Sequence, residues 1–164
     1  MANGGFLNLN GRLAEILQQA IGETLKDTFQ IRIHPEAWRV GREMPKEIDS
    51  LEISQIDLRQ ESVSYGAFIA AFDREILLKI LSQYNPKGVS DQEMIDDAAA
   101  EIANMVYGLF KTAVNRSGYH LAMNVPVTPK AKADIIEKYK NAEKLIQPFM
   151  VDGRQCLIII AQNH

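Results

Sequence analysis

Cysteine and histidine are scarce in this sequence of 164 residues. Cys156 is the only cysteine, and His34, His120 and His164 lie far apart along the chain. A cysteine nucleophile needs a polarising neighbour such as histidine, and structural metal sites need clustered His and Cys. We therefore expect no bound cofactor and no metal site. In its apolar run, Cys156 is expected to be a buried small hydrophobic residue.

Basic excess and long apolar runs are also missing. The formal net charge is −3, and no cluster of Lys and Arg alternates with aromatic residues, so nucleic acid is not an expected partner. No apolar run approaches the roughly 20 residues of a membrane helix, and the first residues do not resemble a signal peptide. The sequence predicts a cytoplasmic protein without a membrane partner.

The remaining composition is that of an ordinary globular protein. Apolar residues make up 46% and charged residues 24% of the chain, which excludes disorder and fibrous architectures. The length allows a real hydrophobic core but is short for two ordinary domains. We expect residues 1–164 to form a single domain.

Apolar residues recur with helical spacing in some segments and alternate in others. The clearest signals are a capping box at Ser90 and Glu93, a left-handed stop at Gly118, and Asp152-Gly153, which suits a type I′ hairpin turn. The expected elements are a helix over 8–29, a short strand over 30–34, strands around 56–58 and 63–71, a short helix from Asp73 to Asn85-Pro86, a long helix from Ser90 to Gly118, an edge strand or strand end over 121–127, a helix from Thr128-Pro129, and a terminal hairpin of 145–151 and 154–161.

The long helix carries two stripes of residues at spacings of three and four. One stripe is apolar and is expected to be buried. It comprises Met94, Ala98, Ile102, Met105, Leu109 and Ala113. The other stripe is Asp97, Glu101, Asn104 and Gly108. It could be an ordinary solvated face, because acidic residues are common near a helix N-terminus. However, Asn is a poor choice for a helix interior, and the surrounding alanines would let another surface approach closely.

Glu101 and Asn104 lie one helical turn apart and could together orient the chemistry of another protein. The Asn amide donates and accepts hydrogen bonds, so it can hold a water in line with a phosphoryl group, while the carboxylate engages a cation. Water positioning of this kind operates in phosphoryl-hydrolysing switches. A hundredfold acceleration of a labile acyl phosphate requires a barrier only ~2.7 kcal/mol lower.

The spacing of these residues resembles a family signature. Asp97, three residues, Glu101, two residues, Asn104, twenty-one residues and Pro126 are similar to the signature of the CheC/CheX/FliY chemotaxis phosphatases. The string Asp-Ala-Ala-Ala-Glu-Ile-Ala-Asn-Met-Val-Tyr-Gly resembles the active-site helix of that family. Outside this window, the order of elements resembles the single-site CheX branch.

This resemblance implies a fold, an activity and a partner. The fold would be α+β, a largely antiparallel sheet with helices packed on it in the CheC-like arrangement, often as a homodimer. The long helix would dock into a phosphorylated CheY-like response regulator, whose own Mg²⁺ would be the metal of the reaction. Glu101 would pair with the active-site lysine of the receiver, and Asn104 would position the attacking water. Supporting or partner-binding roles would fall to Asp97, Gly108, Lys111 and Pro126.

Three alternatives stay open. The same helix could bind a receiver domain without catalysis, as a sequestering or dimerisation module of two-component signalling. It could also belong to a dimeric structural protein in which the motif is fortuitous and buried. A second active site is the third alternative, since Glu15 and Gln18 mimic the Glu and Asn spacing on the first helix. Gly11 there replaces the expected acidic or hydroxyl residue, so one active site is favoured.

Overall fold

A single antiparallel sheet organises the chain. The computed structural model describes residues 7–84, 88 and 91–163. In this part, six strands pair in the order β1-β5-β6-β4-β3, and β2 also pairs with β5. The strands are β1 (His34–Pro35), β2 (Arg39–Gly41), β3 (Glu52–Gln60), β4 (Val63–Phe72), β5 (Glu143–Val151) and β6 (Arg154–Gln162).

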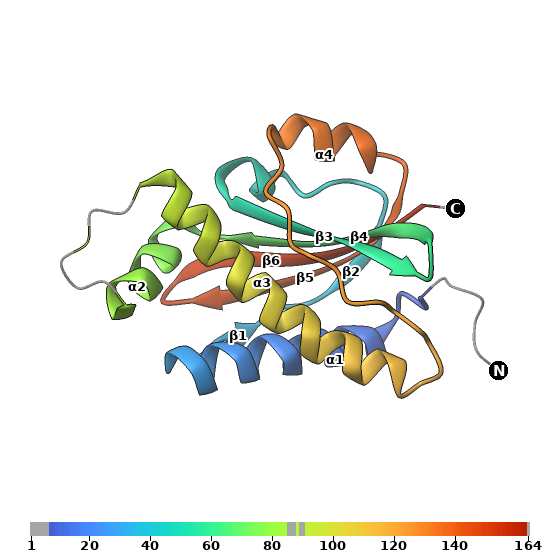
Figure 1. The fold of residues 1–164 in the computed structure, drawn as a ribbon, viewed down its shortest axis with the longest axis horizontal. Helices are drawn as coiled ribbons and strands as arrows, with labels where there is room; N and C mark the ends of the chain where they lie inside the picture. The colour runs from blue at the N-terminus through green and yellow to red at the C-terminus, as the bar shows by residue number, and fades with distance from the viewer. Residues whose placement is uncertain (1–6, 85–87, 89–90, 164) are drawn as a thin grey trace.

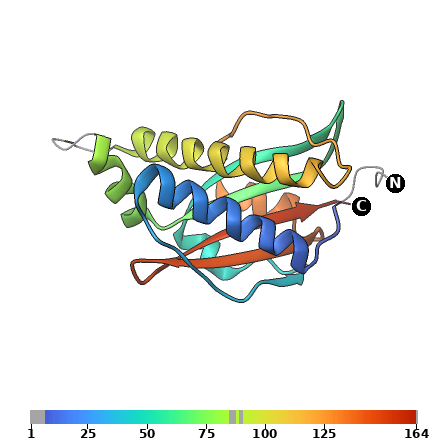
Figure 2. The same ribbon diagram turned by 90° about the horizontal axis from the view of Figure 1, so that it is seen from below.

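Helices cover both faces of this sheet (Figure 1). One face packs against α1 (Gly11–Glu23), α2 (Arg74–Tyr84) and α3 (Gln92–Asn115), and Figure 2 shows α1 and α3 side by side. The other face packs against the 3₁₀ turn η2 (Lys46–Ser50) and α4 (Lys132–Lys138). The predicted α+β architecture with a largely antiparallel sheet is therefore confirmed.

The apolar pattern of β4 explains its central place in the sheet. Phe68, Ala70 and Phe72 join the core beneath α1 and α3, whereas the residues between them join the core beneath α4. A strand that is apolar on both faces must be covered on both sides. The prediction that this strand is central is confirmed, since β4 lies between β6 and β3.

The terminal hairpin agrees with its prediction. Asp152 and Gly153 connect β5 to β6 with φ values of 50° and 75°, the positive pair that a type I′ turn requires. Cys156 on β6 is fully buried, and burial raises the pKa of its thiol to about 12. It is the inert small hydrophobic residue that the sequence predicts.

The first helix begins and ends close to its predicted bounds. Asn10 is its cap, with the side-chain oxygen 3.2 Å from the backbone nitrogen of Leu13. The last turn is not α-helical, because Thr24–Thr28 forms a π-helix, η1. The short strand expected over 30–34 is wrong in its bounds, since β1 contains only His34 and Pro35.

The long helix has a different cap and a different buried face from those predicted. Its cap is Asp91, whose carboxylate accepts from the backbone N–H of Met94 at 2.9 Å; Ser90 lies outside the described residues, as do Asn85 and Pro86. Gly118, with a φ of 98°, ends the turn that follows.

The predicted buried stripe of α3 is rotated. Ala98 and Ile102 are buried as expected, but Met94, Met105 and Ala113 are only half-buried and Leu109 is 41% exposed. The face against the sheet is completed instead by Ile95, Ala99, Ala103, Val106, Tyr107, Phe110 and Val114. Both sets of residues are apolar, so helical periodicity could not choose between them, and the packing of α3 on the sheet does.

The segment after α3 is not the predicted strand. Residues 121–127 run extended beside β3 and form one isolated bridge, in which the backbones of Gln55 and Val127 exchange two hydrogen bonds of 2.9 and 2.7 Å. Val125 and Val127 are exposed, because this stretch contacts the edge of the sheet without extending it. The following helix, α4, starts at Lys132 rather than at Thr128-Pro129.

Candidate functional site

The polar stripe of α3 forms a ridge on the side of the helix that faces away from the sheet. Asp97, Glu101 and Asn104 are exposed, and Gly108 is half-buried. We call these four residues the motif ridge. Within the described part of the chain, the side chains of Asp97, Glu101 and Asn104 form no hydrogen bond or ion pair. They are therefore free to engage a molecule that approaches the helix.

The backbone near the ridge is open to close approach. A Cβ built on Gly108 would meet no atom within 4 Å, and the neighbouring Ala100 is half-buried and short. Small residues on a helix let a second surface lie close to the functional side chains. The ridge thus presents Glu101 and Asn104 on a low surface that a flat partner could cover.

An apolar hollow of about 220 Å³ adjoins the Glu101 side of the ridge. Tyr84 is 61% exposed there, and its ring meets Phe29 edge-on at 6.0 Å. The lining residues are Phe29, Ile80, Leu81, Tyr84, Met94, Asp97, Ala98, Glu101 and Ile102. A carboxylate at the border of an apolar surface attracts a cation more strongly once a partner excludes water, because the local dielectric constant falls.

A second hollow, of about 530 Å³, adjoins the Asn104 side of the ridge. It lies between η1 and α3, and we call it the η1 hollow. Its lining residues are Glu23, Thr24, Asp27, Thr28, Asn104, Met105, Gly108, Leu109 and Thr112. The motif ridge therefore has one hollow beside Glu101 and another beside Asn104, and each hollow is lined by two carboxylates, Asp97 and Glu101 in one and Glu23 and Asp27 in the other.

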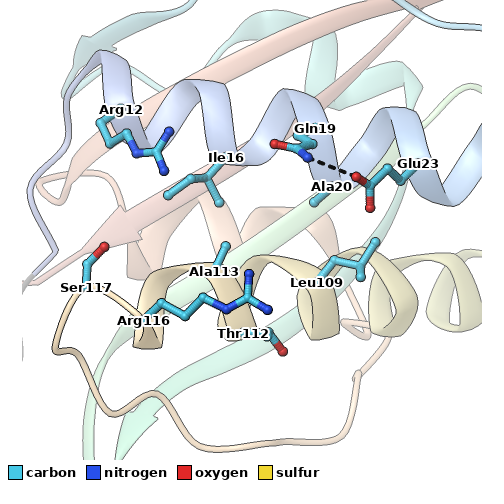
Figure 3. Close-up of a pocket in the computed structure, with 10 residues that line it drawn as sticks. All are labelled: Arg12, Ile16, Gln19, Ala20, Glu23, Leu109, Thr112, Ala113, Arg116 and Ser117. Atoms are coloured by element: carbon cyan, nitrogen blue, oxygen red, sulfur yellow. Dashed lines mark hydrogen bonds between the residues drawn. The ribbon is translucent and has the colours of Figure 1, made fainter.

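A groove of about 330 Å³ continues from the η1 hollow between α1 and α3 (Figure 3). Glu23, Leu109 and Thr112 line both. Arg12 of α1 and Arg116, which directly follows α3, also line this groove, and the Arg116 guanidinium lies beside Thr112. The end of the groove that it shares with the η1 hollow thus carries one acid, Glu23, and the rest of the groove carries two guanidinium groups.

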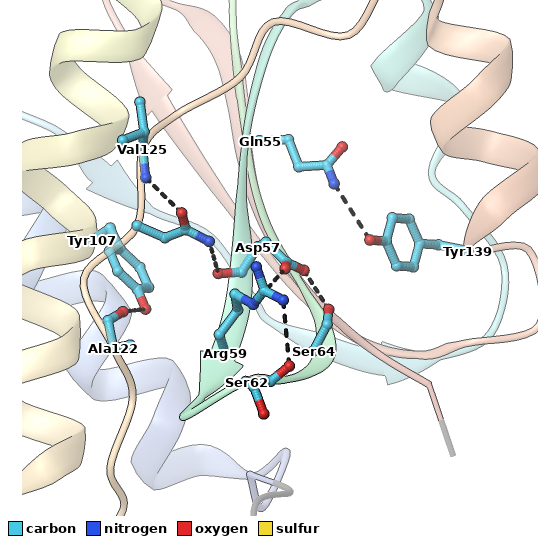
Figure 4. A network of polar contacts seen from close by, with 10 residues as sticks. Gln55, Asp57, Arg59, Ser62, Ser64, Tyr107, Ala122, Val125 and Tyr139 are labelled. Carbon is cyan, nitrogen blue, oxygen red and sulfur yellow. Dashed lines mark hydrogen bonds and ion pairs between the residues drawn. The ribbon is translucent and has the colours of Figure 1, made fainter.

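Pro126 belongs to the segment that Figure 4 shows attached to β3 and α3. The Tyr107 hydroxyl of α3 donates to the carbonyl of Ala122 at 2.7 Å, and the amide of Asn124 donates to the carbonyl of Asp57 at 3.4 Å. Burial, with the Asp57 charge as a smaller cause, raises the pKa of Tyr107 to about 12. These bonds fix the segment beside α3, and none of them involves Pro126 itself.

Lys111 and the first helix complete the set of predicted residues. Lys111 is half-buried on α3, two turns beyond Asn104, and forms no ion pair within the described chain.

The first helix does not form a second motif ridge. On α1, the Gln18 amide donates to Gln147 on β5 at 2.9 Å, which turns Gln18 toward the sheet. Glu15 instead faces solvent 3.6 Å from Arg12. The two side chains that mimic the motif thus point in different directions and do not form a ridge.

Neither a metal site nor a membrane-spanning helix is found in the described part of the chain. No group of three or more His, Cys, Asp or Glu side chains among the described residues could hold a metal ion. No described helix is long and apolar enough to cross a membrane. Sequence reasoning did not place Glu23, Thr24 and Asp27 beside Asn104, because only the packing of η1 against α3 brings them there.

Solved structures with this fold come from several bacteria. A CheC-like superfamily protein from Shewanella sp. PV-4 is 18% identical with a TM-score of 0.68, over 94% of this chain and 99% of that one. The chemotaxis protein CheX from Vibrio vulnificus is 20% identical with a TM-score of 0.68, over 93% and 100%. One chain of the CheX–CheY–BeF₃–Mg²⁺ complex from Borrelia burgdorferi is 24% identical with a TM-score of 0.67, over 96% of this chain and 100% of that one. Among curated protein sequences, none matches significantly.

Sequence comparison with family models gives a more specific result than the fold. The model described as chemotaxis phosphatase CheX matches residues 53–150. This range contains β3 without its first residue, the whole of β4, α2, α3 with its motif ridge and α4, the segment of Pro126, and β5 without its last residue. The match and the shared fold agree with the resemblance of the motif, and the chain belongs to the chemotaxis phosphatase CheX family.

Proposed function

We propose that this chain accelerates hydrolysis of the phosphoaspartate of a CheY-like receiver domain, with Glu101 and Asn104 as the residues that act. The observation that carries the proposal is the motif ridge, where both side chains are exposed and unpaired in a member of the CheX family. A self-contained active site would hold a nucleophile or a base in contact with these residues. The ridge instead supplies half of a site.

Asn104 is proposed to orient the attacking water. Its amide can accept from the water and donate to a phosphoryl oxygen, which holds the water in line with the phosphorus atom. Attack forms the new P–O bond, the bond to the aspartyl oxygen breaks, and inorganic phosphate leaves as the receiver's carboxylate is restored. The chain forms no covalent bond and requires no proton acceptor of its own in this scheme.

Glu101 is proposed to hold the receiver in place. Residues three apart on a helix have Cβ atoms ~5–6 Å apart, so the carboxylate can pair with an active-site lysine while Asn104 reaches the phosphoryl group. The Mg²⁺ that neutralises phosphoryl charge would belong to the receiver. Asp97, Gly108, Lys111 and Pro126 would shape the surface around this pair. Such a receiver is cytoplasmic, so we expect the chain to act there.

The test is a phosphate-release assay with purified receiver domains from the same organism. The wild-type chain should shorten the phosphoryl lifetime, whereas Asn104→Ala should lose at least about 2 kcal/mol of barrier lowering, or ~30-fold in rate. Because Asn104 is exposed and unpaired within the described chain, and because alanine favours a helix interior, the unfolding midpoint of the variant should not fall. Glu101→Ala should chiefly weaken binding of the phosphorylated receiver.

The same assay separates catalysis from simple binding. A non-catalytic module would bind the phosphorylated receiver while leaving its phosphoryl lifetime unchanged in the presence of the wild-type chain. That outcome would refute the proposal. A homodimer is also proposed from the family resemblance, and light scattering after size exclusion measures it directly.

A further inference from the structure

The apolar hollow beside Glu101 has a surface that the proposed reaction does not use. The reaction requires one carboxylate and one amide, yet every residue that lines this hollow, apart from Asp97 and Glu101, is apolar or aromatic. Its volume of about 220 Å³ lies below the roughly 300–1,000 Å³ of pockets for small molecules. The size of the hollow therefore suits a single side chain of another protein better than a free ligand.

The walls of the apolar hollow are already in place before any partner arrives. The Gln83 amide of α2 donates to the carbonyl of Phe29, the last residue of the η1 segment, at 2.9 Å. Phe29 is buried, as are Ala98 and Ile102 on the α3 wall, and all three belong to the core. A pocket whose walls are fixed in advance costs little ordering when it is filled.

Packing within the chain leaves the mouth of the hollow uncovered. Tyr84 is 61% exposed, and Leu81 and Met94 are only half-buried. Met94 belongs to the stripe that periodicity predicts to be buried, yet it borders the motif ridge instead of joining the core. Exposed apolar surface with a polar rim is typical of interaction sites. A partner that covers the ridge would cover this surface as well.

The charges at the edge of the hollow restrict what can fill it. Asp97 and Glu101 lie one helical turn apart and are exposed, and neither forms an ion pair within the described chain. Among the described residues, no Lys or Arg lines the hollow. An acidic or wholly apolar surface would leave two carboxylates desolvated without a partner, which is costly. An apolar side chain with a cation beside it complements both the walls and the edge.

We infer that the apolar hollow receives one apolar side chain of the receiver domain, carried next to the cation that pairs with Glu101, and that Tyr84 covers this side chain. The inference rests on the proposed function, because it names a second contact of the same docking event. Filling the hollow excludes water beside Glu101 and thereby strengthens its pairing with the cation. The contact would determine which receivers bind and would leave the orientation of water to Asn104.

The first test removes the exposed ring. Tyr84→Ala should weaken binding of a beryllofluoride-loaded, Mg²⁺-bound receiver about tenfold, because an apolar side chain would no longer be covered. KM for the phosphorylated receiver should rise by a similar factor at unchanged kcat. The matched control is Trp38→Ala, since Trp38 is a 40% exposed aromatic residue between β1 and β2, beside Gly11 at the start of α1. This control should change neither value.

A fluorescent variant reports directly on the hollow. Trp38 is the only tryptophan of the chain, so the double variant Trp38→Phe, Tyr84→Trp places the sole indole at the mouth of the hollow. The conservative aromatic replacement should retain binding. With the receiver's own signal subtracted, its emission should shift to shorter wavelength when the beryllofluoride-loaded receiver binds. Binding without such a shift would overturn the inference.

The receiver side of the contact is tested by a double-mutant cycle. Exposed apolar residues near the phosphorylation site of the receiver are changed to alanine one at a time. One change should weaken binding about tenfold against the wild-type chain but less than about threefold against Tyr84→Ala, because the contact is then already lost. Additive losses at every position would show that no receiver side chain meets Tyr84.

The outcomes distinguish this inference from the proposed function. If Tyr84→Ala binds and turns over the receiver like the wild type while Asn104→Ala is inactive, the inference is wrong and the proposed function stands. Loss of kcat at unchanged KM in Tyr84→Ala would also overturn the inference, since the hollow would then belong to the catalytic step. If the wild-type chain leaves the phosphoryl lifetime unchanged, the proposed function is wrong, and the binding cycle still shows whether the hollow is filled.

Discussion

Tyr107 shows how a residue outside the motif supports it. Its ring packs edge-on against Phe68 at 5.4 Å in the core, and its hydroxyl donates to Ala122 in the segment that leads to Pro126. The residue thus joins α3, the sheet and that segment at one point. Its protonated hydroxyl is needed for this bond, which makes the contact sensitive to alkaline pH.

Alkaline pH should loosen the protein in a predictable window. Burial, assisted by the Asp57 charge, raises the pKa of Tyr107 and of Tyr139 to about 12. A group whose pKa is raised in the folded state contributes stability that is present below its ordinary pKa and is lost as the pH rises toward the folded value. The free energy of unfolding should therefore fall between about pH 10 and about pH 12.

Two measurements check this expectation. Urea midpoints should decline above pH 10, and absorbance at 295 nm should show the ionisation of Tyr107 and Tyr139 near pH 12. Tyr107→Phe should remove one late-titrating group and lower the stability at neutral pH by about 1–2 kcal/mol, because the Ala122 carbonyl loses its donor. Ionisation of Tyr107 and Tyr139 near pH 10 in the folded protein would contradict the assignment.

At the scale of elements, the cap of α3 determines how firmly the motif ridge is held. Asp91 satisfies a backbone N–H of the first turn and places a negative charge at the positive end of the helix. Asp91→Ala should lower the free energy of unfolding by ~1 kcal/mol, and Asp91→Asn should recover most of that loss. Chemical denaturation measures both; equal stability of the Ala variant and the wild type would place the cap elsewhere.

The sequence predicted elements best where local chemistry decides them. Asn10, Asp73 and Asp152-Gly153 begin helices or form a turn through interactions with their immediate neighbours, and each acts as expected. The motif ridge can also be predicted from the sequence, because helical spacing alone puts Glu101 and Asn104 on one side of α3.

Elements whose form depends on distant contacts could not be predicted in this way. The alternation of Leu121, Met123, Val125 and Val127 suggested a strand, but Tyr107 and β3 hold the segment by a few bonds and leave Met123 57% exposed. The buried face of α3 is selected by the shape of the sheet, and the wall of the η1 hollow by the place where α1 ends. Tertiary packing decides these features, and a single sequence does not display it.

At the scale of the whole molecule, the two central strands β4 and β6 approach each other closely at Gly66. A Cβ added to Gly66 would lie 1.9 Å from the carbonyl oxygen of Ala161, and Gly66 has a φ of 159°. Gly66→Ala should therefore force the two central strands apart and destabilise the protein by about 3 kcal/mol.

A second glycine provides the control for this prediction. Gly22 lies inside α1, where an added Cβ would meet no atom within 4 Å. Gly22→Ala should raise the free energy of unfolding by about 0.5–1 kcal/mol, because alanine favours the helix. Thermal unfolding of the two variants should shift in opposite directions, and a neutral Gly66→Ala would show that the sheet can separate without cost.

The unpaired side chains of the motif ridge should affect the rate at which the proposed receiver associates. Since Glu101 and Asn104 form no hydrogen bonds within the described chain, no internal bond has to break before a receiver docks. Both residues also stand on a long helix that the core already holds in place. Association should then proceed at the speed of encounter and orientation, without a slow rearrangement of this chain. The proposed hydrolysis would then begin as soon as a phosphorylated receiver reaches the motif ridge.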